Sequence, residues 1–128
     1  MPLGQAYLDR STLPGITKAQ GVFAGGGAAA NCTQAGPING VVSVTYNAAT
    51  GRYLITFADV GGIIVGDGCK VARAQGAVPL FVNLVHSTFS QANKTVEIDV
   101  RTEAALTDLA TTDRLYVNVN FAPNPQNS

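Results

Sequence analysis

From residue 38 onward, apolar and polar residues alternate with a period of two, which is the pattern of β-strands that bury one face. The alternation is regular in the segments 39–47 and 52–60, which the residues 48–51 separate. Gly51 ends this connection and can supply the positive φ that a four- or five-residue hairpin loop needs. The pattern therefore predicts a β-hairpin over Gly40–Val60. The residues expected in the hairpin core are Tyr46, Tyr53, Ile55 and Phe57.

Four further segments carry strand signals, namely 69–74, 78–89, 95–102 and 114–122. Only Thr102–Ala110 has a composition that suits a helical turn or two, with Thr102 as its N-cap. Short strands with regular turn signals and almost no helix predict an all-β fold, a single antiparallel β-sandwich or jelly-roll-like domain. The side chains expected to face its core are Val96, Ile98, Val100, Leu115, Val117, Val119 and Phe121. Those expected to point outward are Glu97, Asp99 and Arg101.

The two ends of the chain have a different character. Residues 1–17 contain Pro2, Gly4, Pro14 and Gly15 and show no sustained period, so we expect an extended N-terminal arm. The arm is nevertheless too apolar for a purely solvated segment, which suggests that it docks on a neighbouring protein. We expect the sandwich to occupy residues 18–121 and an exposed tail to occupy 122–128. The apolar residues of the arm are Leu3, Tyr7, Leu8, Leu13 and Ile16.

Composition narrows the class of function. The chain has 128 residues, which suits one domain, and it is 46% hydrophobic and only 12% charged. A surface with so little charge suits a subunit that packs against copies of itself, and we expect a homo-oligomer, most simply a trimer. The formal net charge is zero and the basic residues are scattered, so nucleic-acid binding is not expected. No apolar run is long enough to span a membrane. The first residues show no basic region followed by an apolar one, so we expect no secretory signal.

The segment from Lys18 to Cys32 is rich in glycine and alanine. A phosphate-binding loop would need Lys-Ser or Lys-Thr after its glycines, and here Gly25-Gly26-Gly27 is followed by alanines. A flexible linker is a second interpretation, although Val22 and Phe23 favour burial. A third is a strand followed by glycines that let backbones approach closely, as at a subunit contact or a curved edge.

Few residues are candidates for catalysis or metal binding, and we expect no enzymatic activity, no cofactor and no metal. Cys32 and Cys69 are either two small buried hydrophobes or one disulfide, and a cytoplasmic site of synthesis favours the first. His86 is the single histidine, so it could bind a metal only where several copies meet at a symmetry axis. Glu97 and Asp99 lie on one strand face with Arg101, which indicates a polar exterior rather than a catalytic carboxylate pair.

Two motifs resemble a known family. Lys18, Ala19, Phe23, Gly25 and Gly27 match the first strand of the β-rich module that recurs in virion proteins of tailed bacteriophages, especially tail-fibre-type proteins. The resemblance covers roughly residues 18–121, and residues 1–17 have no counterpart. Gln20 stands where the module usually has Trp, Gly21 replaces Val and Cys69 replaces an aromatic residue. The second motif is matched by Ser43, Val44, Thr45, Asn47, Thr50, Gly51, Tyr53 and Phe57.

The resemblance implies a β-sandwich and a virion context. Two functions from different classes remain. One is a non-enzymatic structural protein of a tailed-phage particle, a capsid decoration protein or short fibre module that contacts other virion proteins and is assembled in the bacterial cytoplasm. The other is a receptor- or glycan-binding module of a tail fibre that recognises the host surface. The residues expected to make oligomer or docking contacts are Leu3, Tyr7, Leu8, Leu13, Gly25, Gly26, Gly27 and Tyr116.

Overall fold

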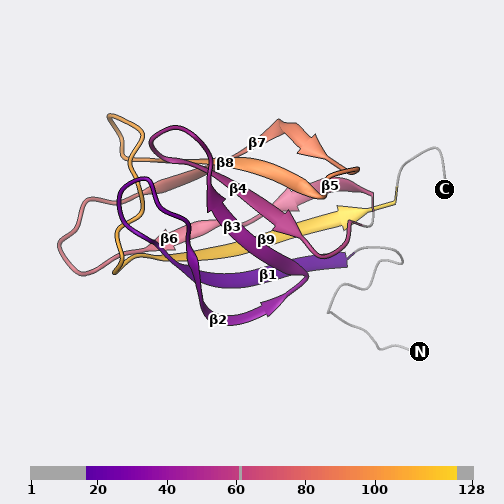
Figure 1. Ribbon diagram of the computed structural model, residues 1–128, viewed down its shortest axis with the longest axis horizontal. Coiled ribbons are helices and arrows are strands. Elements are labelled where there is room, and N and C mark those ends of the chain that lie inside the picture. Colours follow the sequence, from indigo (N-terminus) through magenta and orange to yellow (C-terminus); the bar gives the residue numbers. More distant parts are fainter. Residues whose placement is uncertain (1–16, 61, 124–128) are drawn as a thin grey trace, which may run out of the picture.

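The computed structural model describes residues 17–60 and 62–123, and over these residues the protein is an all-β sandwich (Figure 1). This confirms the predicted fold class. The described residues form no helix, and so none that is long and apolar enough to cross a membrane. The strands are β1 (Thr17–Ala24), β2 (Thr33–Asn39), β3 (Val41–Tyr46), β4 (Arg52–Phe57), β5 (Ile63–Asp67), β6 (Lys70–Ala72), β7 (Phe81–Ser90), β8 (Thr95–Arg101) and β9 (Arg114–Ala122).

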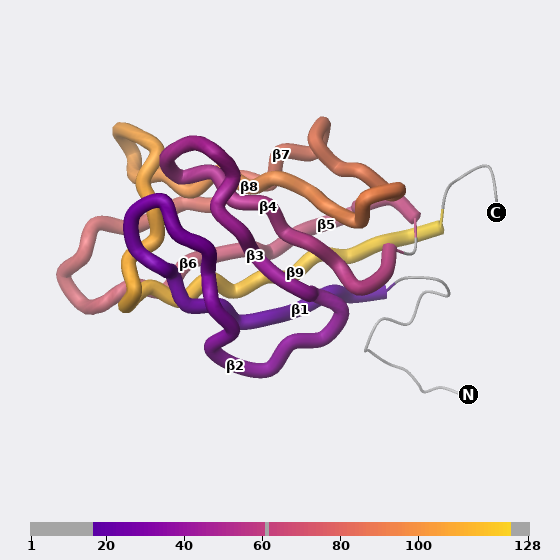
Figure 2. Tube along the Cα trace, viewed as in Figure 1, coloured from indigo at the N-terminus to yellow at the C-terminus, as the bar shows by residue number. Residues whose placement is uncertain are grey.

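The strands form two antiparallel sheets that pack face to face. One sheet has the order β2-β1-β9-β5, with β6 also paired to β9, and the other has the order β3-β4-β8-β7. The chain passes from one sheet to the other between β2 and β3, between β4 and β5, between β6 and β7, and between β8 and β9 (Figure 2). The last strand, β9, therefore lies in the middle of its sheet, where β1 covers one side and β5 and β6 cover the other.

The core lies between the sheets and includes the residues on β4, β8 and β9 whose inward direction the alternation predicts. Every predicted inward residue on β4, β8 and β9 is at most 2% exposed. Phe57 and Phe121 meet edge to face across the two layers, with ring centroids 5.0 Å apart. Tyr46 is only partly buried, and it packs edge to face on Tyr53. Alternation along β4 and β8 in one sheet and along β9 in the other thus gives each sheet an apolar face, and burying those faces joins the sheets.

The predicted hairpin is present, and Gly51 has the predicted positive φ, +74°. A second feature also requires glycine at this position. A Cβ on Gly51 would lie 2.5 Å from the carbonyl oxygen of Val100 and 2.8 Å from the amide nitrogen of Thr107. The Gly51 carbonyl also accepts a hydrogen bond of 2.6 Å from the Val100 N–H, so the hairpin loop is fixed to β8.

The prediction of a helical turn in Thr102–Ala110 is wrong. Thr102 does accept hydrogen bonds through its Oγ1, from the N–H groups of Ala104 and Ala105, but these close a turn and begin no helix. Beyond the turn, Thr107 donates its N–H to the Val100 carbonyl, and the Leu109 side chain is fully buried in the core. Bonds to β8 and burial of one leucine outweigh the local preference for a helix.

Two strands have no counterpart among the predictions. β2 contains Gly36 and Pro37 and is exposed along most of its length, so it lacks the alternation that marks a half-buried strand. It is an edge strand, the position in which proline is tolerated because its missing N–H is not needed. β5 is short and carries a register irregularity against β9 between Ile64 and Gly66. Both β2 and β5 form because they pair with an adjacent strand, and neither has a local sequence pattern that predicts it.

Candidate functional site

The residues that the sequence suggests as contacts lie in three places. Leu3, Tyr7, Leu8 and Leu13 fall outside the described residues. The glycine run follows β1 at one end of the sandwich, and Tyr116 lies on the outer face of β9. These positions do not form one site.

Gly25 and Gly26 make close contacts with the backbone of their own chain. A Cβ on Gly25 would lie 2.3 Å from the Ala110 carbonyl oxygen, and one on Gly26 would lie 2.2 Å from the Asn31 carbonyl oxygen. The Gly27 N–H donates to the Leu109 carbonyl at 3.0 Å. The interpretation as a strand followed by close backbone approach is thus correct, with the approach occurring inside the subunit. A contact of the run with another subunit stays a prediction.

Two carboxylates hold this end of the sandwich together. Asp108 accepts hydrogen bonds from the N–H groups of Gly51, at 2.7 Å, and Ala29, at 3.0 Å. Asp113 is almost fully buried, where it accepts the Ala110 N–H and pairs with Arg73 at 2.9 Å. Arg73 also donates to the Val78 carbonyl, which fixes the connection that leads into β7. These charged groups serve structural roles.

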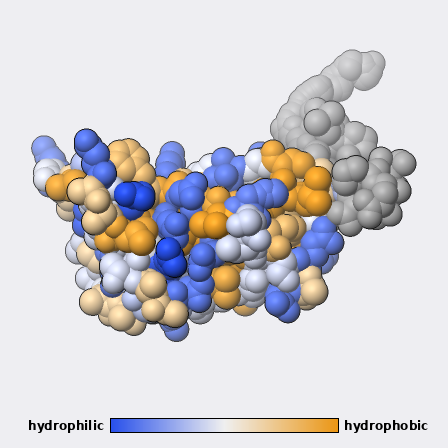
Figure 3. All heavy atoms as spheres, turned by 90° about the horizontal axis from the view of Figure 1, so that it is seen from above, coloured by the Kyte–Doolittle hydropathy of each residue, from blue (hydrophilic) through white to orange (hydrophobic). Residues whose placement is uncertain are grey.

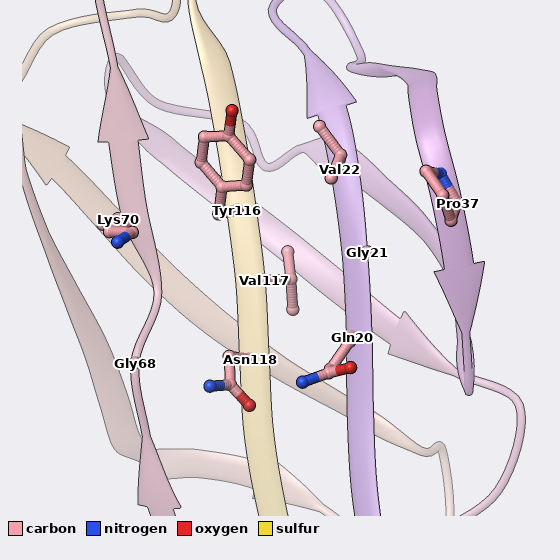
Figure 4. A pocket seen from close by; sticks show the side chains of 9 residues that line it. All are labelled: Gln20, Gly21, Val22, Pro37, Gly68, Lys70, Tyr116, Val117 and Asn118. Atoms are coloured by element: carbon pink, nitrogen blue, oxygen red, sulfur yellow. The ribbon is translucent and has the colours of Figure 1, made fainter.

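A groove crosses the outer face of the five-stranded sheet beside Tyr116, and we call it the Tyr116 groove (Figure 4). Its volume is about 370 Å³. Tyr116 is opposite Val22 on β1 and opposite Lys70 on β6, so three strands bring these side chains together. The tyrosine is 37% exposed, which makes it available to a ligand or a partner. The prediction of Tyr116 as a contact residue therefore remains open, and the groove adds neighbours that the sequence did not suggest.

Amide side chains form the polar end of the Tyr116 groove. Gln20 and Asn118 are opposite each other in the register of β1 and β9, and both amides lie at one end of the groove in Figure 4. Gly68 leaves room for the Asn118 amide, because a Cβ there would lie 3.3 Å from Asn118 Nδ2. The Asn118 Oδ1 atom is buried and accepts no hydrogen bond within the described part of the chain. The groove thus joins an aromatic end to a neutral amide end, and no carboxylate lines it.

A second candidate surface is the free edge of β7. β7 is the last strand of its sheet and pairs only with β8 among the described strands. The register is regular from Phe81 to Val85 and is then interrupted up to Ser90, so we call the residues Phe81–Val85 the open edge. An unpaired strand edge is a template for pairing with another chain unless charge, proline or a covering segment blocks it.

The open edge has four apolar residues and the neutral Asn83, and it carries no charged residue. Phe81 is 56% exposed, and Val78, in the preceding connection, is 59% exposed. From residue 74 to residue 93 the sequence contains no Asp, Glu, Lys or Arg. Figure 3 views the molecule from the top of Figure 1, where β7 lies, and shows apolar residues interspersed with polar ones on this side. The usual charge barrier against strand pairing is therefore missing here.

The two cysteines are free thiols that pack against the core. Burial raises the pKa of the Cys32 thiol from 9.0 to about 11, and burial also raises the pKa of the Cys69 thiol to about 11. Cys69 additionally donates a weak hydrogen bond to the Asn118 carbonyl. Thiols with raised pKa values are poor nucleophiles at neutral pH, so both act as small apolar side chains.

The remaining candidates are separate surface groups. His86 is exposed in the irregular part of β7, while Asp99 pairs with Arg52 at 3.5 Å and Glu97 accepts a hydrogen bond from the Asn47 amide. Within residues 17–60 and 62–123, no three His, Cys, Asp or Glu side chains gather as metal ligands. A metal held by His86 from several copies stays a hypothesis.

Comparisons with models of protein families, with curated protein sequences and with solved structures find no match to this chain. The candidate surfaces are therefore the Tyr116 groove and the open edge of β7, as their geometry defines them.

Proposed function

We propose that this protein is a non-enzymatic structural subunit of a tailed-phage virion, a self-associating β-sandwich that serves as a capsid decoration protein or short fibre module. The observation that carries the proposal is the open edge, an exposed and uncharged strand edge on a closely packed sandwich. The resemblance of residues 18–121 to tail-fibre-type modules supports the virion context. Low surface charge supports self-association, for which we propose a homotrimer.

Solution mass tests the self-association. Light scattering on the full-length protein at micromolar concentration should give a multiple of the 13.2 kDa chain, and a stable monomer would contradict the proposal. Mass spectrometry of purified particles tests the virion location. A virion that lacks the chain would contradict the structural role, whatever the oligomeric state.

Deletion of the N-terminal segment tests the predicted arm. A chain that begins at Thr17 retains β1 from its first residue, so its circular dichroism should remain that of a β-sandwich. We expect this variant to be lost from assembled particles, because the arm is proposed to dock on a neighbouring protein. Normal incorporation would show that the arm is not the anchor, and unfolding would show that it belongs to the sandwich.

The Tyr116 groove favours a second function, binding of a glycan on the host surface. The face of Tyr116 can stack on the C–H face of a sugar ring, and the neutral amides of Gln20 and Asn118 can exchange hydrogen bonds with hydroxyl groups. A glycan array probed with the full-length protein tests this function. Tyr116→Ala should abolish any signal, while Tyr46→Ala, a change at a tyrosine outside the groove, should keep it. Equal signals from both variants would contradict recognition through the groove.

A further inference from the structure

The direction of the backbone groups at the open edge follows from the hydrogen bonds of β8. Val100 donates its N–H to Gly51 and accepts from Thr107 through its carbonyl, and both partners lie on the side of β8 away from β7. Directions alternate along an antiparallel strand, so the neighbouring residues Asp99 and Arg101 bond to β7. Their partners there are Asn83 and Phe81.

The residues between these partners point the other way. Val82 and Leu84 direct their N–H and C=O groups away from β8, where no described strand receives them. The open edge therefore offers two donors and two acceptors. Asn83 lies at the centre of the regular stretch, with Val82 and Leu84 on either side and Phe81 and Val85 at its ends.

We infer that two copies of this chain join through their open edges, antiparallel, with Asn83 on the two-fold axis. In this register Val82 of each copy faces Leu84 of the other, and each such pair exchanges two hydrogen bonds. All four backbone groups of each open edge are then satisfied. The two four-stranded sheets become one continuous sheet across the axis. The inference rests on the proposed self-association and adds a two-fold contact to it.

The side chains on the outer face support the same register. With Asn83 on the axis, Phe81 of one copy lies directly opposite Val85 of the other, and symmetry produces this pair twice. Phe81 is exposed in the single chain, and an aromatic residue opposite a β-branched one is a favourable cross-strand pair. The two Asn83 amides meet at the axis, where each can donate to and accept from the other. No charged residue of β7 opposes pairing.

A contact of this kind constrains the symmetry of the assembly. It uses the same surface on both copies, so it closes after two subunits. A trimer must use another surface, and a protein that uses both contacts would form a hexamer of two trimers. The inference therefore predicts an even number of subunits, whereas a trimer alone would contradict it.

Charge substitutions on the axis test the inference. Asn83→Lys places two ammonium groups opposite each other, and Asn83→Asp places two carboxylates there, so each variant alone should dissociate at the two-fold contact. We expect the dissociation constant of the two-fold contact to rise roughly tenfold or more, because two like charges at cross-strand distance repel each other. An equimolar mixture of the two variants should reassociate as mixed pairs. Asn83 is exposed, so circular dichroism should show an unchanged fold.

Native mass spectrometry of the full-length proteins gives the readout, with Asn93→Lys in the exposed turn before β8 as the matched control. An even-numbered wild type, smaller Asn83 variants and recovery on mixing support the inference. Asn83 variants that keep the wild-type mass, or that fail to recover on mixing, overturn it while self-association stands. A monomeric wild type overturns both proposals. If the Val82 and Leu84 N–H groups of that monomer exchange slowly, another segment of the same chain pairs with the open edge.

Discussion

Replacing Gly51 by alanine measures how firmly the β3–β4 hairpin is fixed to β8. The residue has φ = +74°, and a side chain in the left-handed region costs about 1–2 kcal/mol. The added Cβ would lie 2.5 Å from the Val100 carbonyl oxygen and 2.8 Å from the Thr107 nitrogen, and backbone atoms cannot rotate away. Any shift also weakens the bonds of Gly51 to Val100 and to Asp108, each of which contributes about 1 kcal/mol. Together these effects predict a loss of about 3–4 kcal/mol in the free energy of unfolding.

Gly76 offers a matched control for this experiment. Its φ is +84°, and a Cβ there would meet nothing within 4 Å, so Gly76→Ala carries the conformational cost without the clash. We expect this variant to lose only about 1 kcal/mol. Urea denaturation of both variants, fitted to a two-state transition, gives the difference between them. Equal losses would refute the assignment of a steric role to the Gly51 contacts, and a loss below about 1 kcal/mol for Gly51→Ala would refute both parts of the reasoning.

Three further predictions concern buried groups. Phe57→Ala should cost about 3–5 kcal/mol in chemical denaturation, because it empties the centre of the core, and a loss under 1 kcal/mol would contradict its assigned position. Asp113→Asn should cost about 1.5–3 kcal/mol, since it removes the buried charge that pairs with the partly exposed Arg73, and a double variant with Arg73→Met should recover part of the loss. Thiol labelling of Cys32 and Cys69 should be slow at neutral pH. Because folding raises both pKa values from 9.0 to about 11, their contribution to stability is complete below pH 9 and is lost as the pH rises toward 11, which denaturation across that range would show.

Local alternation was a reliable guide where a strand is covered by the other sheet. The inward residues of β4, β8 and β9 could be predicted because their side chains alone decide which face is buried. Alternation did not predict β2, because this strand is exposed along most of its length and has no apolar face. The Thr102–Ala110 prediction failed for a related reason. The segment has a helix-favouring composition and a possible N-cap, but its hydrogen bonds to β8, which cannot be read from the sequence, outweigh that preference.

The candidate surfaces were predicted less completely than the core. Tyr116 could be chosen from the sequence as an outward aromatic residue, but its neighbours Val22 and Lys70 come from two other strands, β1 and β6, that are distant in sequence. The glycine run was correctly associated with close backbone approach. Its partner, the Ala110 carbonyl, could not be named in advance because that contact joins two loops.

The sequence by itself determined the fold class, the β3–β4 hairpin and the facing of the central strands, because each depends on residues that are neighbours along the chain. Only the tertiary structure decided the order of strands within the two sheets. That order places β9 in the middle of one sheet, where residues of β1 and β6 flank Tyr116 and form the groove with it. It leaves β7 at the edge of the other sheet. Strand pairing is made by backbone groups that every residue carries, so the same alternation is compatible with many strand orders. The order is set by the packing of the whole chain, and both candidate surfaces depend on it.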